Sequence, residues 1–116
     1  MTEYNLELYK LKANLCKTFS DPKRLIILDA LRNGEKSVGE LVQMLNIGQA
    51  IVSRQLAILK DRGIVTPRRS GTTIYYSLTD PRVCNACDLV HEILLKQIKK
   101  NKETAERLVK NTYKVN

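Results

Sequence analysis

The sequence predicts a mainly α-helical fold with one small β-hairpin. Apolar residues recur at helical spacing along most of the 116 residues. Two short runs rich in β-branched and aromatic residues, 64–66 and 73–78, interrupt this pattern in the second half of the chain. The length fits one domain, since domains usually hold about 100 to 200 residues. We therefore expect residues 1–116 to form one domain in which helices precede and follow the hairpin.

The charge balance favours an anionic partner. The chain has 20 Lys and Arg against 12 Asp and Glu, a net charge of +8. Nucleic acid is the first candidate, because binding an anionic membrane surface would need a helix with one basic and one bulky apolar face, and these charges are spread over the chain. No apolar run approaches the roughly 20 residues that span a bilayer, and the N-terminus lacks the pattern of a secretion signal. We therefore expect a cytoplasmic protein with no membrane partner, whose 3 cysteines are reduced thiols.

Start and stop signals divide the first part of the chain into three helices. The first is expected over about residues 4–18 and carries one apolar stripe. The second begins at Ser20-Asp21-Pro22, and its apolar residues surround nearly the whole circumference, which places it at the centre of the domain. Ser37 and Glu40 match a capping box that opens a short third helix. The apolar residues of the second helix are Leu25, Ile26, Ile27, Leu28, Ala30 and Leu31.

A fourth helix is expected from Gln49 to Arg62, where Gly63 ends it. A helical wheel gathers its bulky apolar residues on one side and leaves a slim polar side opposite them. Such a helix packs through one face and presents the other. The polar side holds Gln49, Ala50, Ser53, Arg54, Ala57 and Lys60.

The two β runs predict a hairpin with a basic tip, followed by a long helix. Residues 67–72 would join the strands and carry Arg68 and Arg69. Asp80-Pro81 then opens a final helix to about residue 100, which could resume after Asn101 and reach about Tyr113.

This order of elements is that of a winged helix-turn-helix. The helix that begins at Gln49 would enter the major groove of DNA, where small residues allow close approach and polar residues bond to base edges or phosphates. The basic hairpin would lie against phosphates or in the neighbouring minor groove. We predict that residues 20–79 bind double-stranded DNA. The expected contact residues are Gln49, Ala50, Ser53, Arg54, Lys60, Arg68 and Arg69.

Several segments carry the motifs of one known family. They are SDPKRL at 20–25, EL at 40–41, LNIGQAIVSRQL at 45–56, LKDRGIV at 59–65 and YYSL at 75–78. Together they resemble the arsenic-repressor-like (ArsR, or ArsR/SmtB) family of winged-helix repressors. The resemblance implies a symmetric homodimer, formed by the first helix and by about residues 81–113. Such a dimer binds a palindromic operator and is released by an inducer, often a metal ion. The resemblance also places Gln49, Ala50, Ser53 and Arg54 at the family's DNA-contacting positions.

Two metal sites of that family are absent from this sequence. Metal-responsive members commonly carry Cys-Val-Cys at the start of the helix before the recognition helix, where this chain has Ser37-Val38-Gly39. A second family site uses Asp and His on the last helix, and only Asp80 matches it. The other ligand positions hold Arg82, Ile93 and Lys96.

One other candidate for a ligand site remains on the last helix. Cys84, Cys87 and His91 follow each other at spacings of three and four, so they share a helix face and could hold Zn(II) or another thiophilic metal ion or metalloid as inducer. Cys16 of the first helix would be a fourth ligand if these helices met in the dimer. Two interpretations stay open beside this one, a redox switch through the same thiols and simple packing in a dimer interface.

An enzymatic function is not expected. The chain has a single His, no Gly-rich phosphate loop and no nucleophile elbow, and its carboxylates are scattered, so no acid and base pair can be assembled. No cofactor is required by the predicted function. The alternatives are a winged-helix regulator without a metal site and a winged-helix module that binds protein or RNA.

Overall fold

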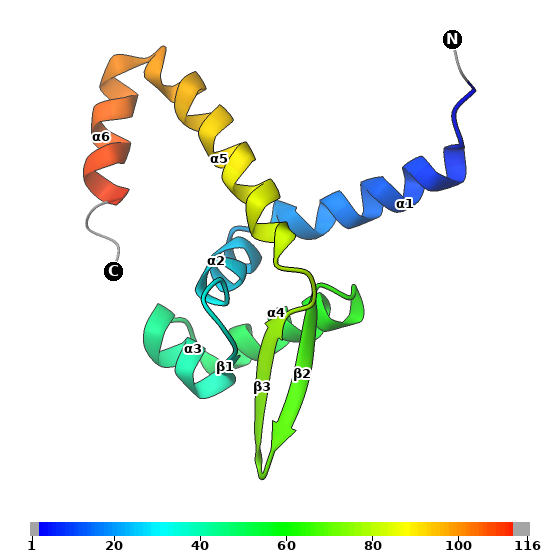
Figure 1. The fold of residues 1–116 in the computed structure, drawn as a ribbon. Coiled ribbons are helices and arrows are strands. Elements are labelled where there is room, and N and C mark those ends of the chain that lie inside the picture. Colours follow the sequence, from blue (N-terminus) through cyan, green and yellow to red (C-terminus); the bar gives the residue numbers. More distant parts are fainter. Residues whose placement is uncertain (1–2, 113–116) are drawn as a thin grey trace. The chain divides into compact units, whose positions relative to one another are not determined.

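Figure 1 shows the computed structural model of the chain, which describes residues 3–112 apart from the side chains of residues 103–105 and 112. Contacts within the chain divide it into two compact units, residues 1–81 and 82–116. The predicted fold class, mainly helical with a small β-sheet, is confirmed. No helix in the described part of the chain is long and apolar enough to cross a membrane. The elements of the first unit are α1 (Leu6–Lys17), the short 3-10 helix η1 (Thr18–Ser20), α2 (Pro22–Ala30), β1 (Lys36–Ser37), α3 (Val38–Leu45), α4 (Gln49–Asp61), β2 (Val65–Ser70) and β3 (Thr73–Leu78).

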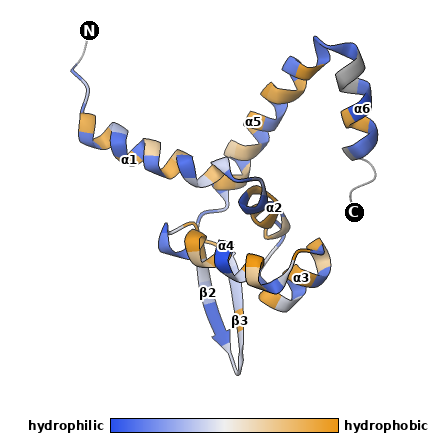
Figure 2. Cartoon of the chain, turned by 180° about the vertical axis from the view of Figure 1, so that it is seen from behind, coloured by the Kyte–Doolittle hydropathy of each residue, from blue (hydrophilic) through white to orange (hydrophobic). Residues whose placement is uncertain are grey.

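The core of the first unit lies between α2, α3, α4 and the start of β2, and Figure 2 shows hydrophobic residues on these helices. Burial of aliphatic side chains contributes about 1.5–3 kcal/mol each, so this cluster holds α4 in place. The prediction that α2 is buried around nearly its whole circumference is wrong at Leu25 and Ile26, which are 38% and 44% exposed. The core packs against one side of α2 only. Its buried residues are Ile27, Leu28, Ala30, Leu31, Leu41, Val52, Leu56, Leu59 and Val65.

Capping groups set the helix boundaries close to where the sequence predicts them. Asp21 caps α2 by accepting a hydrogen bond from the Lys23 N–H at 2.8 Å, and this bond is the main reason why the pKa of Asp21 lies below its ordinary value. The capping box of α3 is confirmed: Ser37 Oγ accepts from the Glu40 N–H at 3.1 Å, and Glu40 Oε1 accepts from the Ser37 N–H at 3.0 Å. Asn46, in the left-handed conformation, ends α3 and leads into α4.

The sheet has three antiparallel strands in the order β1-β3-β2, where the sequence predicts two. The additional strand β1 pairs with Tyr75 and Tyr76 of β3. On the other side of β3, Pro67 of β2 lies opposite Tyr76. Proline has no N–H to donate, and it is tolerated here because β2 is an outer strand of the sheet.

The hairpin differs from the prediction at its tip. β2 continues to Ser70, so Arg68 and Arg69 lie within a strand and not in a connecting loop. The expected loop over residues 67–72 shrinks to a turn at Gly71 and Thr72. Gly71 has a φ of +62°, which glycine adopts without the strain of a side chain.

The second unit contains two helices, α5 (Arg82–Lys99) and α6 (Lys102–Thr112). The predicted interruption at Asn101 is confirmed, since its N–H donates to the carbonyl of Ile98 at 2.9 Å and helical structure resumes at Lys102. Tyr113, the predicted end of this segment, lies outside the described residues.

Candidate nucleic-acid interface

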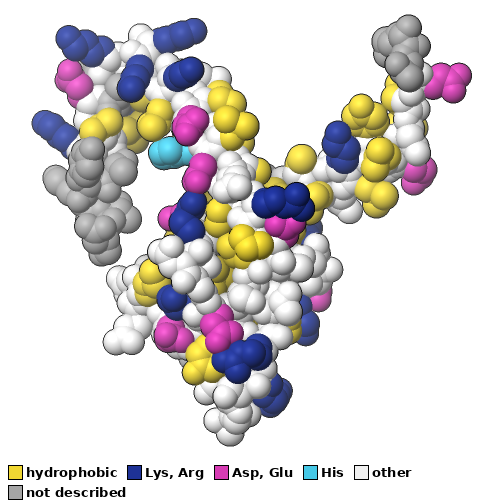
Figure 3. All heavy atoms as spheres, viewed as in Figure 1, with side chains coloured by type: hydrophobic (Ala, Val, Ile, Leu, Met, Phe, Trp, Pro, Cys, Tyr) yellow, Lys and Arg dark blue, Asp and Glu magenta, His cyan; other side chains and the backbone are white. Residues whose placement is uncertain are grey.

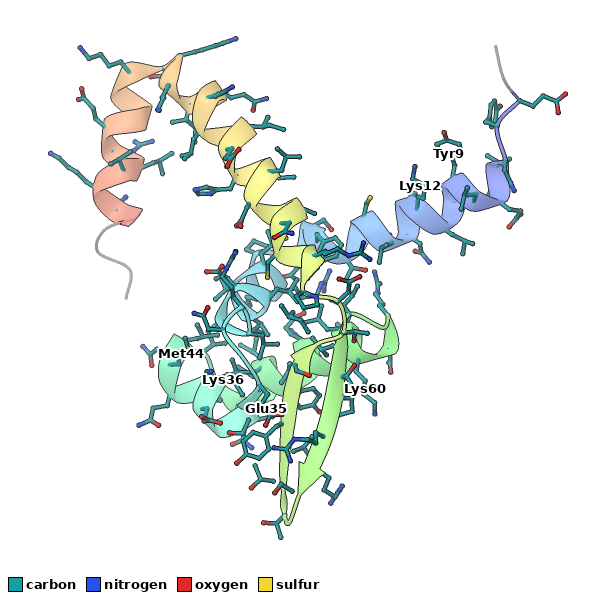
Figure 4. All side chains as sticks on the ribbon, in the orientation of Figure 1. Tyr9, Lys12, Glu35, Lys36, Met44 and Lys60 are labelled. Atoms are coloured by element: carbon teal, nitrogen blue, oxygen red, sulfur yellow. The ribbon has the colours of Figure 1, made fainter. Side chains whose placement is uncertain are left out.

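α4 has one buried side and one exposed side. Val52, Leu56 and Leu59 are each 0% exposed and anchor the helix in the core. The side chains predicted for the polar side are all exposed, which confirms the helical-wheel assignment. The slim polar face, as we call this surface, consists of Gln49, Ala50, Ser53, Arg54, Ala57 and Lys60, of which Lys60 is labelled in Figure 4.

The first turn of α4 suits an anion. Gly48 stands at the N-cap and has no side chain to cap the helix. The N–H groups of Ile51 and Val52 donate to the Gly48 carbonyl at 3.1 and 3.0 Å, whereas those of Gln49 and Ala50 precede the first helical hydrogen bond. Backbone donors and the helix dipole at such a terminus attract negative charge, which a DNA phosphate would supply.

The hairpin places its two arginines in different surroundings. The Arg68 guanidinium donates two hydrogen bonds to Glu35, at 3.0 Å from Nε and 2.6 Å from the second nitrogen, and lies 5.1 Å from the centre of the Tyr75 ring. Arg69 is the next residue in the strand, so its side chain points to the opposite face. Figure 4 labels Glu35 beside the sheet, and Figure 3 shows Lys and Arg side chains over the region of β2 and β3. Arg68 is therefore held by the protein itself.

This ion pair changes the titration of both partners. The hydrogen bond from Arg68 holds the pKa of Glu35 below its ordinary value, and the hydrogen bond to Glu35 raises the pKa of Arg68. Both side chains are substantially exposed, so water and salt screen the pair. Its main effect is geometric, because it fixes the direction of one basic side chain on the hairpin.

The four predicted metal donors differ in their exposure to solvent. Cys16 of α1 is exposed, Cys84 of α5 is buried, Cys87 is intermediate and His91 is exposed. None of the three cysteines is in a disulfide. Within the described residues there is no group of three or more His, Cys, Asp or Glu side chains that could hold a metal ion. The described part of a single chain therefore offers no three-donor Zn(II) site.

Sequence reasoning missed a partly buried polar cluster on the side of α4 away from the slim polar face. It joins Thr18 of η1, Arg24 of α2, Gln55 of α4 and Arg62 at the C-terminal end of α4. One signal could have found it. Gln55 falls on the wheel among the apolar residues of α4, where a polar side chain needs a partner.

The exposed face of α4, its helix-turn-helix partner α3 and the adjoining hairpin together define a winged helix-turn-helix regulator of transcription. Comparison with known proteins gives the family. A profile described as "Bacterial regulatory protein, arsR family" matches residues 21–66. The chain is 42% identical over 87 residues to a biofilm growth-associated repressor of Xylella fastidiosa, over 75% of this chain and 76% of that protein. The chain belongs to the arsR family of bacterial regulatory proteins.

Solved structures agree with this assignment. The crystal structure of the transcriptional repressor BigR from Xylella fastidiosa matches with a TM-score of 0.69 and 40% identity, over 80% of this chain and 96% of that one. The solution structure of the homodimeric winged helix-turn-helix DNA-binding domain of Mb0332 from Mycobacterium bovis matches with a TM-score of 0.68 and 29% identity, over 81% and 90%. The family resemblance seen in the sequence is thus confirmed, and the class is a regulator of transcription and not an enzyme.

Titration of Glu35 tests the contact on the hairpin. Its side-chain carbon, followed by NMR, should titrate with a midpoint below 4.5. A carboxyl whose pKa is lowered by folding stabilises the fold above its unfolded pKa, and this contribution is lost as the pH falls through the folded value. Arg68→Gln should move the midpoint back towards 4.5, whereas the matched change Arg69→Gln should not. A midpoint that Arg68→Gln leaves unchanged would contradict the ion pair.

Proposed function

We propose that this protein is a sequence-specific DNA-binding repressor that acts as a homodimer on a palindromic operator. The observation that carries the proposal is the slim polar face, exposed on a helix whose other side is fixed in the core. The description of the Xylella fastidiosa relative as a repressor supports it, and so does the net charge of +8. Because the proposed ligand is DNA, the proposed location is the cytoplasm.

The residues of the interface take different roles. Gln49, Ser53 and Arg54 would bond to base edges, since Gln pairs well with adenine and Arg with guanine. Ala50 leaves space for close approach to the bases. Lys60, Arg68 and Arg69 would contact phosphates, and for Arg68 this contact requires that phosphate replaces or joins Glu35 as its partner.

The dimer would form through α1 and α5. None of the residues of α1 is buried in the chain, although several are large and apolar, and α5 exposes a similar set. Figure 2 shows hydrophobic residues along both helices. Exposed apolar surface of this extent marks an interaction site, and the homodimeric state of Mb0332 supports a second copy as its partner. The exposed apolar residues are Leu6, Leu8, Tyr9, Leu11 and Leu15 of α1 and Leu89, Val90, Ile93 and Leu94 of α5.

An inducer would act at Cys84 and Cys87 of α5. These thiols lie one helical turn apart, which allows both to bind one thiophilic ion or metalloid. Since one chain does not gather three donors among its described residues, a further ligand such as Cys16 or His91 would have to come from the partner subunit or from solvent. A regulator that responds without metal, through thiol oxidation or a protein partner, is the alternative.

Substitutions on α4 and the hairpin test the roles in DNA binding. On a duplex that the protein itself selects from a random pool, Arg54→Ala should cost about 1–3 kcal/mol, with little effect on a scrambled duplex, because a base contact is lost. Arg69→Ala should weaken both duplexes equally and lower the slope of log K against log salt by about 1, because a phosphate contact is lost. Fluorescence anisotropy across a salt series measures both. Lys10→Ala on α1 is the control, and equal losses for Arg54→Ala and Arg69→Ala on both duplexes would contradict the roles.

A charge on the apolar stripe of α1 tests the dimer. Leu11→Glu places a carboxylate where the partner is expected, so sedimentation velocity should show monomers at concentrations where the wild-type protein is dimeric. Ala13→Glu adds the same charge about 200° around the helix from Leu11, outside the stripe of Leu8, Leu11 and Leu15, and should weaken the dimer less than Leu11→Glu does. Wild-type protein that sediments as a monomer would rule the proposed interface out.

Ligand titrations test the inducer. Zinc or arsenite added to the protein bound to its selected duplex should lower the affinity about 5- to 150-fold, the usual range of allosteric coupling. Cys84→Ser and Cys87→Ser should each remove the response, and Cys16→Ser shows whether the third thiol takes part. If both α5 variants respond like the wild type, the inducer does not act at these thiols.

A further inference from the structure

Two polar side chains are buried in the described part of the chain, and they are linked. Thr18 is 0% exposed and Gln55 is 3% exposed, while all other residues of the buried set are apolar. Thr18 follows directly on α1, and Gln55 lies in the middle of α4. Polar groups in such positions are costly unless they are paired, so their partners reveal what they hold together.

Arg24 of α2 joins the two. Its Nε donates to the carbonyl oxygen of Thr18 at 2.8 Å, and its Nη1 donates to Oε1 of Gln55 at 3.2 Å. Asp21, at 3.6 Å from the same Nη1, supplies the compensating charge. The Arg24 side chain is only 13% exposed, so these contacts are shielded from water. A guanidinium has fixed donor directions, and it therefore constrains Gln55 in angle as well as in distance.

A second hydrogen bond connects Thr18 to the C-terminal end of α4. Nη1 of Arg62 donates to Oγ1 of Thr18 at 3.1 Å. The recognition helix is thus tied to Thr18 at two points, through Arg24 at Gln55 and directly at Arg62. We call Thr18, Arg24, Gln55 and Arg62 the polar clamp.

The clamp adds a directional constraint on the rotation of α4 about its own axis to the constraint that apolar packing supplies. Gln55 lies about 200° around α4 from Ser53, on the side away from the slim polar face. Aliphatic side chains repack with little directional preference, whereas hydrogen bonds weaken steeply with angle. A roll of α4 by about 20° would shift atoms at the edge of the helix, roughly 5–6 Å from its axis, by about 2 Å. Such a shift is enough to break a bond to a base edge.

We propose that the polar clamp sets the roll of α4 and that Arg24 and Gln55 are positioning residues for base recognition. The proposal rests on the proposed DNA-binding function. Neither residue belongs to the slim polar face, and their role is to aim Ser53 and Arg54. Because Thr18 continues from α1, the clamp also connects α4 to the helix that carries the exposed apolar stripe.

Near-isosteric variants of Gln55 test the proposal. Gln55→Met keeps the volume and removes the acceptor, whereas Gln55→Glu keeps an acceptor for Arg24. The readout is the ratio of the affinities for a duplex that the wild type selects from a random pool and for a scrambled duplex of the same length. Gln55→Met should lower this ratio on the order of tenfold and leave the scrambled duplex and the salt slope unchanged, since phosphate contacts remain. Gln55→Glu should keep most of the wild-type ratio of affinities, because Arg24 still has an acceptor.

Ile27→Val is the control for stability, because it removes one buried methylene of α2 without touching the clamp, and should lower the thermal midpoint but not the ratio. If Gln55→Met does not fold, Arg24→Lys takes its place, since lysine keeps the charge but not the fork of donors. The proposal is overturned if a folded clamp variant keeps the wild-type ratio of affinities, or if Ile27→Val lowers this ratio as much as the clamp variant does. In either case the DNA-binding function still stands. A wild-type protein that selects no sequence overturns both.

Discussion

The structure depends on α4, a helix that packs into the core on one side and faces solvent on the other. α4 supplies three side chains that are completely buried, and its opposite side is exposed along most of its length. The aliphatic cluster of α2, α3 and β2 provides the hydrophobic free energy that fixes α4, so the exposed side needs no contribution to stability. Residues on that side are therefore free to be chosen for what they bind. Substitutions there should change recognition far more than folding.

The charges of the interface are organised by the protein before any ligand arrives. An exposed ion pair such as that of Arg68 and Glu35 contributes little to stability, so a phosphate could replace Glu35 as the partner of Arg68 without a large loss. Arg69 is exposed and points to the other face of the strand, away from Glu35. The contacts of Arg24 are of another kind, because its side chain is only 13% exposed and water has less access to them. The partner of Arg68 on the hairpin is thus open to exchange with solvent or ligand, whereas the contacts that hold α4 are largely shielded from water.

Most of the fold could be predicted from the sequence because its signals are local. The capping box of Ser37 and Glu40, the stop at Gly63 and the two-sided pattern of α4 are each contained in a few residues. The strand β1 could not be predicted, because it is two residues long and exists only through pairing with β3. The turn residues Pro67 and Gly71 also suggested a longer loop than the one that forms. The bonds of Arg24 and Arg68 join residues 31 and 33 positions apart, which no local pattern encodes.

The position of Pro67 has a consequence for crowded operators. β2 is an outer strand of the sheet, and a regular outer strand invites a neighbouring molecule to add its own strand. Proline interrupts the row of donors on β2, and at the opposite margin β1 is too short to serve as a template. Two dimers bound at neighbouring operators could then stand close together without joining into a continuous sheet, so each dimer would leave the DNA independently.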